Sequence, residues 1–92
     1  MGKDGYLTAT GANITGTITA STGYIGGENG WTIKAGAIYS RTDSMDSSTP
    51  GTYLGIDGIR NYSSNNAYVN IQNGILTAKN ADITGKITAK EG

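Results

Sequence analysis

Small and apolar residues alternate with polar residues near both ends of the chain. Residues 12–20 place Ala, Ile, Gly, Ile and Ala on one file and Asn and Thr on the other, and residues 81–89 repeat this arrangement. A period of two puts successive side chains on opposite faces of a strand, and Ile and Thr favour strands. The pattern predicts a strand in each segment, preceded by a bend and by a shorter strand that begins at Leu7 or Leu76.

The two terminal segments are copies of one sequence element. Residues 5–20 and 74–89 match without a gap as G-x-L-T-A-x-x-A-x-I-T-G-x-I-T-A. One strand cannot bury its narrow apolar file alone, but Gly16 and Gly85 would let neighbouring backbones approach a shared axis. We therefore expect three copies to intertwine, with a trimer core formed by Leu7, Ile14, Ile18, Leu76, Ile83 and Ile87. The alternative is a monomeric β-sandwich whose terminal strands are alike.

Hairpin signals fill the middle of the chain. Apolar and aromatic runs flank Ala35-Gly36, Asp57-Gly58 and Asn73-Gly74, which are typical of tight turns. The almost wholly polar stretch 41–51 predicts an exposed loop, and residues 63–66 predict a second loop. The predicted organisation is an N-terminal repeated strand element at 1–23, a central β-hairpin unit at 24–72 and a C-terminal repeated strand element at 73–92.

The composition limits both the core and the partners. The 92 residues include 15 Gly and no Phe, so a single chain is short of core. The net charge is zero with no basic cluster, which argues against nucleic acid, and no apolar run approaches the ~20 residues of a membrane span. Met1 and the abrupt Glu91-Gly92 end lead us to expect a fragment of a longer protein.

The residue types offer little chemistry. There is no Cys and no His, so disulfides, thiolate sites and His-based triads are excluded, and no catalytic, cofactor or metal residues are predicted. Asp43 and Asp46 lack the spacing of a calcium loop and are interpreted as ordinary loop residues. The central aromatic residues, with Arg41 and Arg60, either line a saccharide-binding surface or fill the core and the subunit contacts. These aromatic residues are Trp31, Tyr39, Tyr53, Tyr62 and Tyr68.

The repeated strings resemble a known family. LTATGANITGTITA and LTAKNADITGKITA are similar to segments of phage and prophage tail proteins from Gram-positive hosts, among them tail fibres, tail-associated lysins and minor structural proteins. The stretches 25–33, 37–40 and 53–58 look like the linking unit of those proteins.

The resemblance implies an all-β, intertwined homotrimeric fibre with triple-stranded β-helix or prism-like ends. It implies a non-enzymatic shaft or connector that is made in the host cytoplasm and built into the virion beside other tail proteins. The alternatives are a tip module that binds a host-surface carbohydrate, or a non-catalytic part of a tail depolymerase such as a hyaluronidase.

Overall fold

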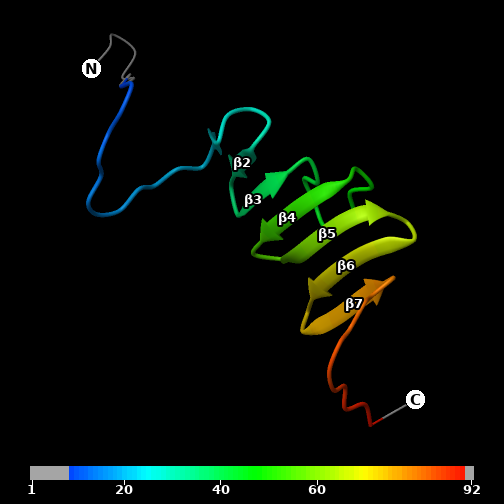
Figure 1. Ribbon diagram of the computed structural model, residues 1–92. Coiled ribbons are helices and arrows are strands. Elements are labelled where there is room, and N and C mark those ends of the chain that lie inside the picture. The colour runs from blue at the N-terminus through cyan, green and yellow to red at the C-terminus, as the bar shows by residue number, and fades with distance from the viewer. Residues whose placement is uncertain (1–8, 91–92) are drawn as a thin grey trace.

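The protein is described by a computed structural model over residues 9–90. The strands within this range form one antiparallel sheet. Its seven strands follow one another in chain order, and each pairs with the next (Figure 1). The strands are β1 (Gly23–Ile25), β2 (Trp31–Lys34), β3 (Ala37–Ser40), β4 (Gly51–Gly55), β5 (Gly58–Ser64), β6 (Ala67–Gln72) and β7 (Ile75–Lys79). The described residues contain no helix, so the predicted all-β class is confirmed.

Two of the predicted turns are present as expected. Lys34 pairs with Ala37, which leaves Ala35-Gly36 as a two-residue turn between β2 and β3. At the β6–β7 turn, Asn73 has a φ of 55° and Gly74 a φ of 79°. Positive φ at both central residues matches the twist of the flanking strands, which is why Asn-Gly favours this turn.

Two other turns differ from the prediction. Gly55 pairs with Gly58, so the β4–β5 turn is Ile56-Asp57, one residue earlier than Asp57-Gly58. The Tyr53 hydroxyl donates to Asp57 Oδ1 at 2.7 Å, a bond that favours this register because it holds Asp57 in the turn. The predicted loop at 63–66 is also wrong in extent: β5 continues to Ser64, with an irregular register after Tyr62.

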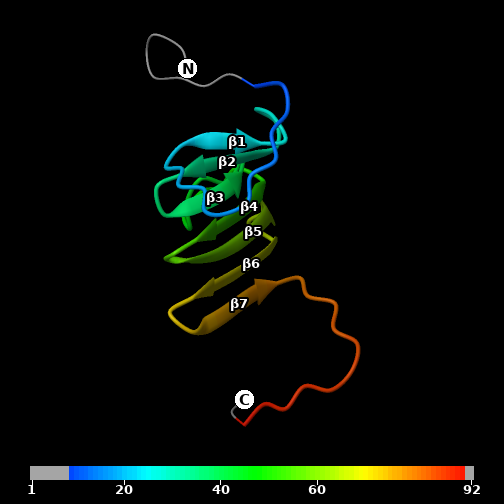
Figure 2. The same ribbon diagram turned by 90° about the vertical axis from the view of Figure 1, so that its left-hand side faces the viewer.

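The sheet is a single layer, and a loop covers part of one face. Figure 2 shows β1 to β7 stacked as one continuous ladder. Segment 41–50 folds back over the sheet and buries Thr42 and Met45, so the exposed loop predicted at 41–51 is exposed only in part. The one apolar side chain in this polar stretch docks against the sheet and brings the loop with it.

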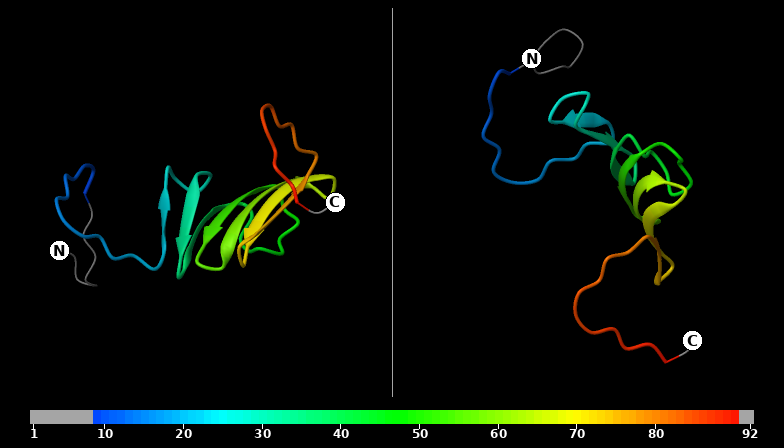
Figure 3. Two further views of the ribbon diagram at one scale, coloured as in Figure 1. Left: turned by 90° about the horizontal axis from the view of Figure 1, so that it is seen from below. Right: turned by 45° about the vertical axis from the view of Figure 1, so that its right-hand side comes forward.

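The longer strands predicted at 12–20 and 81–89 do not form, whereas the shorter strand predicted to begin at Leu76 is present within β7. Residues 9–22 and 80–90 have no ladder partner and leave the sheet at opposite ends (Figure 3). A strand needs a neighbour to satisfy its backbone N–H and C=O groups, and residues 9–90 provide none for either segment. Both copies nevertheless bend at the same glycine, since Gly16 has a φ of 130° and Gly85 a φ of 122°. The repeated sequence therefore sets the same local backbone twice, without setting its pairing.

Candidate functional site

The two faces of the sheet carry different chemistry. Thr32, Tyr39, Tyr53 and Arg60 are successive register partners across β2 to β5, and Tyr62 pairs with Tyr68. Partners in register project from the same face, as do residues two apart on one strand. We call this the tyrosine face. It holds four of the five aromatic residues predicted as a glycan-binding or interface surface.

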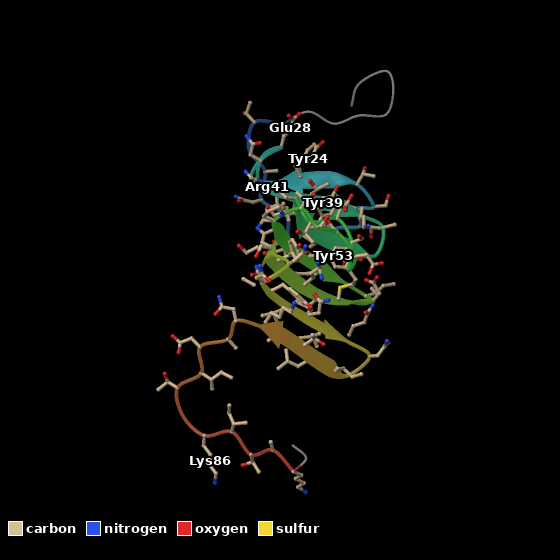
Figure 4. The ribbon with its side chains drawn as sticks, turned by 90° about the vertical axis from the view of Figure 1, so that its right-hand side faces the viewer. Tyr24, Glu28, Tyr39, Arg41, Tyr53 and Lys86 are labelled. Carbon is tan, nitrogen blue, oxygen red and sulfur yellow. The ribbon has the colours of Figure 1, made fainter. Side chains whose placement is uncertain are left out.

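The fifth aromatic residue lies on the other face. Trp31 is one residue away from Thr32 and so projects away from the tyrosines. Tyr53 and Tyr62 are 5% and 6% exposed, whereas Tyr39 and Tyr68 are half-buried (Tyr39 and Tyr53 are labelled in Figure 4). The structure thus does not bring the five aromatics together as one surface, and only part of the set faces solvent.

Loop 41–50 is anchored on the tyrosine face through both apolar and polar contacts. Met45 packs with Ala37 and Tyr53 in the small buried cluster of the chain. Lys34 Nζ donates to the carbonyl oxygen of Asp43 at 2.7 Å and lies 5.4 Å from the centre of the Tyr53 ring. The Thr42 hydroxyl donates to the carbonyl of Thr49 and closes the loop on itself. The loop is therefore a structural cover and not a free appendage.

Tyr53 is held by its environment in the protonated form. Its hydroxyl donates to the Asp57 carboxylate, and this bond, followed by burial, raises the pKa of Tyr53 above its ordinary value. Its ring lies over Gly55, where a Cβ would collide with the ring and the hydroxyl. Tyr53 therefore has a structural role as a cover for the backbone, which excludes its ring face from stacking on a ligand.

The sequence predicts Arg60 only as a neighbour of the central aromatic residues, whereas the structure gives it defined partners. It is 8% exposed, its Nε donates to the carbonyl oxygen of Ser47 at 3.0 Å, and its Nη1 donates to Asn70 Oδ1 at 2.8 Å. Its guanidinium carbon lies 4.4 Å from the centre of the Tyr62 ring and 5.5 Å from that of Tyr68. A cation that is nearly buried among neutral acceptors and ring faces keeps its charge uncompensated.

A pocket of about 390 Å³ opens beside this arginine. It lies between loop 41–50 and the strands β5 to β7 and is lined by Met45, Asp46, Arg60, Tyr62, Asn65, Tyr68, Asn70 and Lys79. Arg41, the other arginine named from the sequence, is exposed and does not line this pocket. The period-two spacing of Arg60, Tyr62, Tyr68 and Asn70 is the sequence signal that places these four side chains on one face.

The opposite face carries an uncovered aliphatic row. Register partners across β2 to β7 align one aliphatic side chain from each strand. We call this the aliphatic face; its row is Ile33, Ile38, Leu54, Ile59, Ile71 and Leu76. Ile33 is half-buried, and the exposure of the other five runs from 37% at Ile38 to 67% at Leu76. Of the predicted trimer-core residues that lie within 9–90, only Leu76 belongs to this face. The other five members of the row were missed because each sits in a short strand whose register the sequence does not fix.

The other predicted trimer-core residues are exposed within a single chain. Ile14, Ile18, Ile83 and Ile87 are each at least 60% exposed, and Leu7 lies outside the described residues. A Cβ added at Gly16 or Gly85 would meet nothing within 4 Å, so neither glycine lies at a close backbone approach in the single chain. The structure leaves both isoleucine files without a covering partner.

The described acidic residues do not converge on a centre. Asp43 and Asp46 are exposed on loop 41–50, Asp57 is bonded to Tyr53, and Asp82 lies on the C-terminal segment. Within residues 9–90 no group of three or more acidic side chains is arranged to hold a metal ion. The same residues contain no helix long and apolar enough to cross a membrane.

Comparisons with protein-family models, curated proteins and solved structures found no match for this chain. The resemblance of the terminal repeats to phage tail proteins stays an expectation from the sequence. The two faces of the sheet and the terminal segments are therefore the features from which a function can be inferred.

Proposed function

We propose that this chain is a shaft or connector segment of a phage tail fibre or tail spike, which assembles as a homotrimer and catalyses no reaction. The observation that supports this most directly is the imbalance between buried and exposed apolar residues. In the described chain only Ala37, Met45, Tyr53 and Tyr62 are buried hydrophobic residues, whereas fourteen large hydrophobic residues are exposed.

The imbalance is large on the scale of protein stability. Monomeric proteins rarely expose a contiguous apolar patch beyond ~300–600 Å², and such patches usually mark interaction sites. Burying one Ile or Leu side chain fully contributes ~1.5–3 kcal/mol to the free energy of unfolding. The incomplete burial of the aliphatic row therefore forgoes a free energy that is large beside the small net stability of a protein of this size. The radius of gyration of 18.0 Å also exceeds the ~12 Å of a compact domain of this length.

Copies of the same chain are the partners that fit these surfaces. An axis of rotation places the same face of each copy toward the centre, so one interface serves every aliphatic face at once. The net charge of zero gives no overall repulsion between copies. The terminal segments leave opposite ends of the sheet, so their isoleucine files would extend the same axis beyond it in both directions (Figure 3). The number three is expected from the repeated isoleucine files and is also implied by the resemblance to tail fibres, which alone implies the proposed place in the virion and the contact with other tail proteins.

Light scattering of the purified chain tests the proposal. We expect a mass three times the 9.5 kDa of one chain. Ile59→Asp on the aliphatic face should reduce that mass to one chain, while Ile56→Asp in the β4–β5 turn, where the side chain is 93% exposed, should leave it unchanged. A folded monomer in dilute solution, with the wild-type sequence, would contradict the assembly and the fibre role together.

A second role is favoured by the pocket beside Arg60. A tip module would bind a host-surface carbohydrate, and the half-buried Tyr68 ring with the surrounding amides offers a surface of that kind. The tyrosine face is opposite to the aliphatic face, so self-assembly through the aliphatic row would leave the pocket open. The third alternative, a non-catalytic part of a tail depolymerase, has no separate structural support.

A further inference from the structure

We propose that the pocket beside Arg60 binds an acidic saccharide, through its carboxylate or phosphate group and one face of a sugar ring. The proposal deepens the second role above and does not depend on the trimeric shaft, because every lining residue belongs to one chain. Its first basis is charge. Arg60 is nearly buried with two neutral acceptors, and Lys79 adds a second positive charge to the same pocket.

Asp46 is the one carboxylate that lines the pocket in the described chain, and its side chain is exposed. One carboxylate against two cations leaves the pocket with a net positive charge. The exposed carboxylate of Asp46 is also screened by water, whereas the nearly buried guanidinium of Arg60 is screened much less. The electrostatics therefore favour an anionic ligand.

The hydrogen-bonding groups of the pocket are also predominantly donors. Arginine has no acceptor, so the Asn70 atom that meets Arg60 Nη1 must be its oxygen, and the Asn70 NH₂ group is left to donate elsewhere. The Tyr62 hydroxyl donates to Asn65 Oδ1, and the Asn65 NH₂ group is then available to donate elsewhere. Lys79 Nζ uses one of its hydrogens on the Asn65 carbonyl at 3.2 Å and keeps the others.

A pocket rich in donors fits a ligand rich in acceptors. Carboxylate and phosphate oxygens accept charge-assisted hydrogen bonds, which are about twice as strong as neutral ones. The aromatic pair adds a second requirement: Tyr62 and Tyr68 are stacked with their ring centres 6.0 Å apart, and both line the pocket, Tyr62 buried and Tyr68 half-buried. A flat apolar ring beside polar amides suits the carbon face of a sugar with its hydroxyls at the rim. The volume of about 390 Å³ also lies within the range of small-ligand sites.

The binding test uses the intact chain and isothermal titration calorimetry. The probes are a hexuronate-containing oligosaccharide, the same oligosaccharide with its carboxylates reduced to alcohols, a sugar phosphate, and inorganic phosphate. We expect the hexuronate compound or the sugar phosphate to bind at least tenfold more tightly than the reduced compound and than inorganic phosphate. Whichever of the two acidic sugars binds more tightly identifies carboxylate or phosphate as the anionic group. Affinity should also fall as NaCl is added.

The variants separate the pocket from general charge. Lys79→Gln should weaken binding about fivefold to tenfold through loss of a charge-assisted contact, whereas Lys86→Gln removes the same charge on the C-terminal segment and should change nothing (Figure 4). Tyr68→Leu should weaken the acidic sugar but not inorganic phosphate. Light scattering of each sample reports assembly separately, so failure of the trimer and failure of the pocket are distinguishable.

Three results would overturn the proposal. The first is equal affinity for the acidic and reduced oligosaccharides, or no binding of any acidic sugar at millimolar concentration. The second is equal affinity for the sugar ligands and inorganic phosphate, which would leave an anion site with no saccharide component. The third is a fall in the assembled mass of Lys79→Gln and Tyr68→Leu without any effect on sugar, which would assign the pocket to contacts between copies.

Discussion

Individual residues on the tyrosine face act by covering backbone and by satisfying one another. Tyr53 shields Gly55 and donates to Asp57, while Arg60 lies over the ring of Tyr62. In so small a core each such contact is a large fraction of the total stability, because the free energy of unfolding is only ~0.05–0.15 kcal/mol per residue. Single substitutions on this face should therefore have clear effects on the free energy of unfolding.

Replacing Tyr53 by Phe should change the pH dependence of stability. The pKa of Tyr53 is raised in the folded state, first by its bond to Asp57 and then by burial. Below pH ~10 the phenol is protonated in both states and contributes no pH dependence; above it the unfolded chain ionises first, so stability falls as pH rises toward the folded pKa. Urea unfolding at pH 8 and at pH 10.5 should show a smaller alkaline loss in Tyr53→Phe than in the wild type. Tyr24→Phe, at a ring that is 58% exposed, is the control, and an equal loss in wild type and Tyr53→Phe would contradict this account.

Gly55→Ala should destabilise the sheet. The added Cβ would occupy the space of the Tyr53 ring, which would have to swing out and lose its bond to Asp57. Overpacking of this kind costs ~1–3 kcal/mol, measurable as a lower urea midpoint. Gly11→Ala adds the same methyl group where nothing lies within 4 Å and should be neutral. Equal midpoints for the two variants would show that the ring does not cover Gly55 in solution.

Among the elements, loop 41–50 differs most from the structure that its sequence predicts. Ten largely polar residues are held on the sheet by Met45, by the bond from Lys34 and by the bond from Arg60 to the Ser47 carbonyl. The turns, by contrast, follow from short-range chemistry, because Asn73-Gly74 can adopt positive φ at both positions. Hairpin turns are thus readable from neighbouring residues, while a docked loop depends on a surface that is distant in sequence.

Met45→Ala should release the loop. Met45 is 6% exposed, and truncation of a buried Met costs ~2–5 kcal/mol. Limited proteolysis should then cut between residues 41 and 50, and urea unfolding should shift to lower concentration. Asp43→Ala is the matched control, because Lys34 bonds to the backbone carbonyl of Asp43 and not to its carboxylate. Cleavage in the control as rapid as in Met45→Ala would mean that the loop is not held by this side chain.

At the scale of the whole molecule, one face of the sheet is partly covered and the other face is exposed to solvent. The loop covers part of the tyrosine face, while the aliphatic row and both isoleucine files stay exposed. A single-layer sheet buries at most one side of each strand, so its second side needs another layer. The proposed assembly supplies that layer from identical copies.

Ile14→Asp or Ile83→Asp should abolish assembly, since a charge at an apolar axis costs several kcal/mol unless it is paired. Thr15→Asp and Thr84→Asp place the same charge on the neighbouring file and should leave assembly intact. Sedimentation velocity at micromolar concentration measures the outcome. Trimers that persist in Ile14→Asp but are lost in Thr15→Asp would show that the two files are exchanged in their roles.

The sequence by itself determined the all-β class and the Ala35-Gly36 and Asn73-Gly74 turns. These depend on backbone preferences of one or two adjacent residues. Only the tertiary structure decided the register, and with it the separation of Trp31 from the tyrosines, the burial of Met45 and the pocket beside Arg60. A shift of one residue moves every side chain of a strand to the other face, so the site depends on pairings that no local pattern specifies. The strands predicted at 12–20 and 81–89 are absent for the same reason: alternation makes a segment able to pair, but a strand exists only where a partner is in reach, as β6 is for the predicted short strand at Leu76.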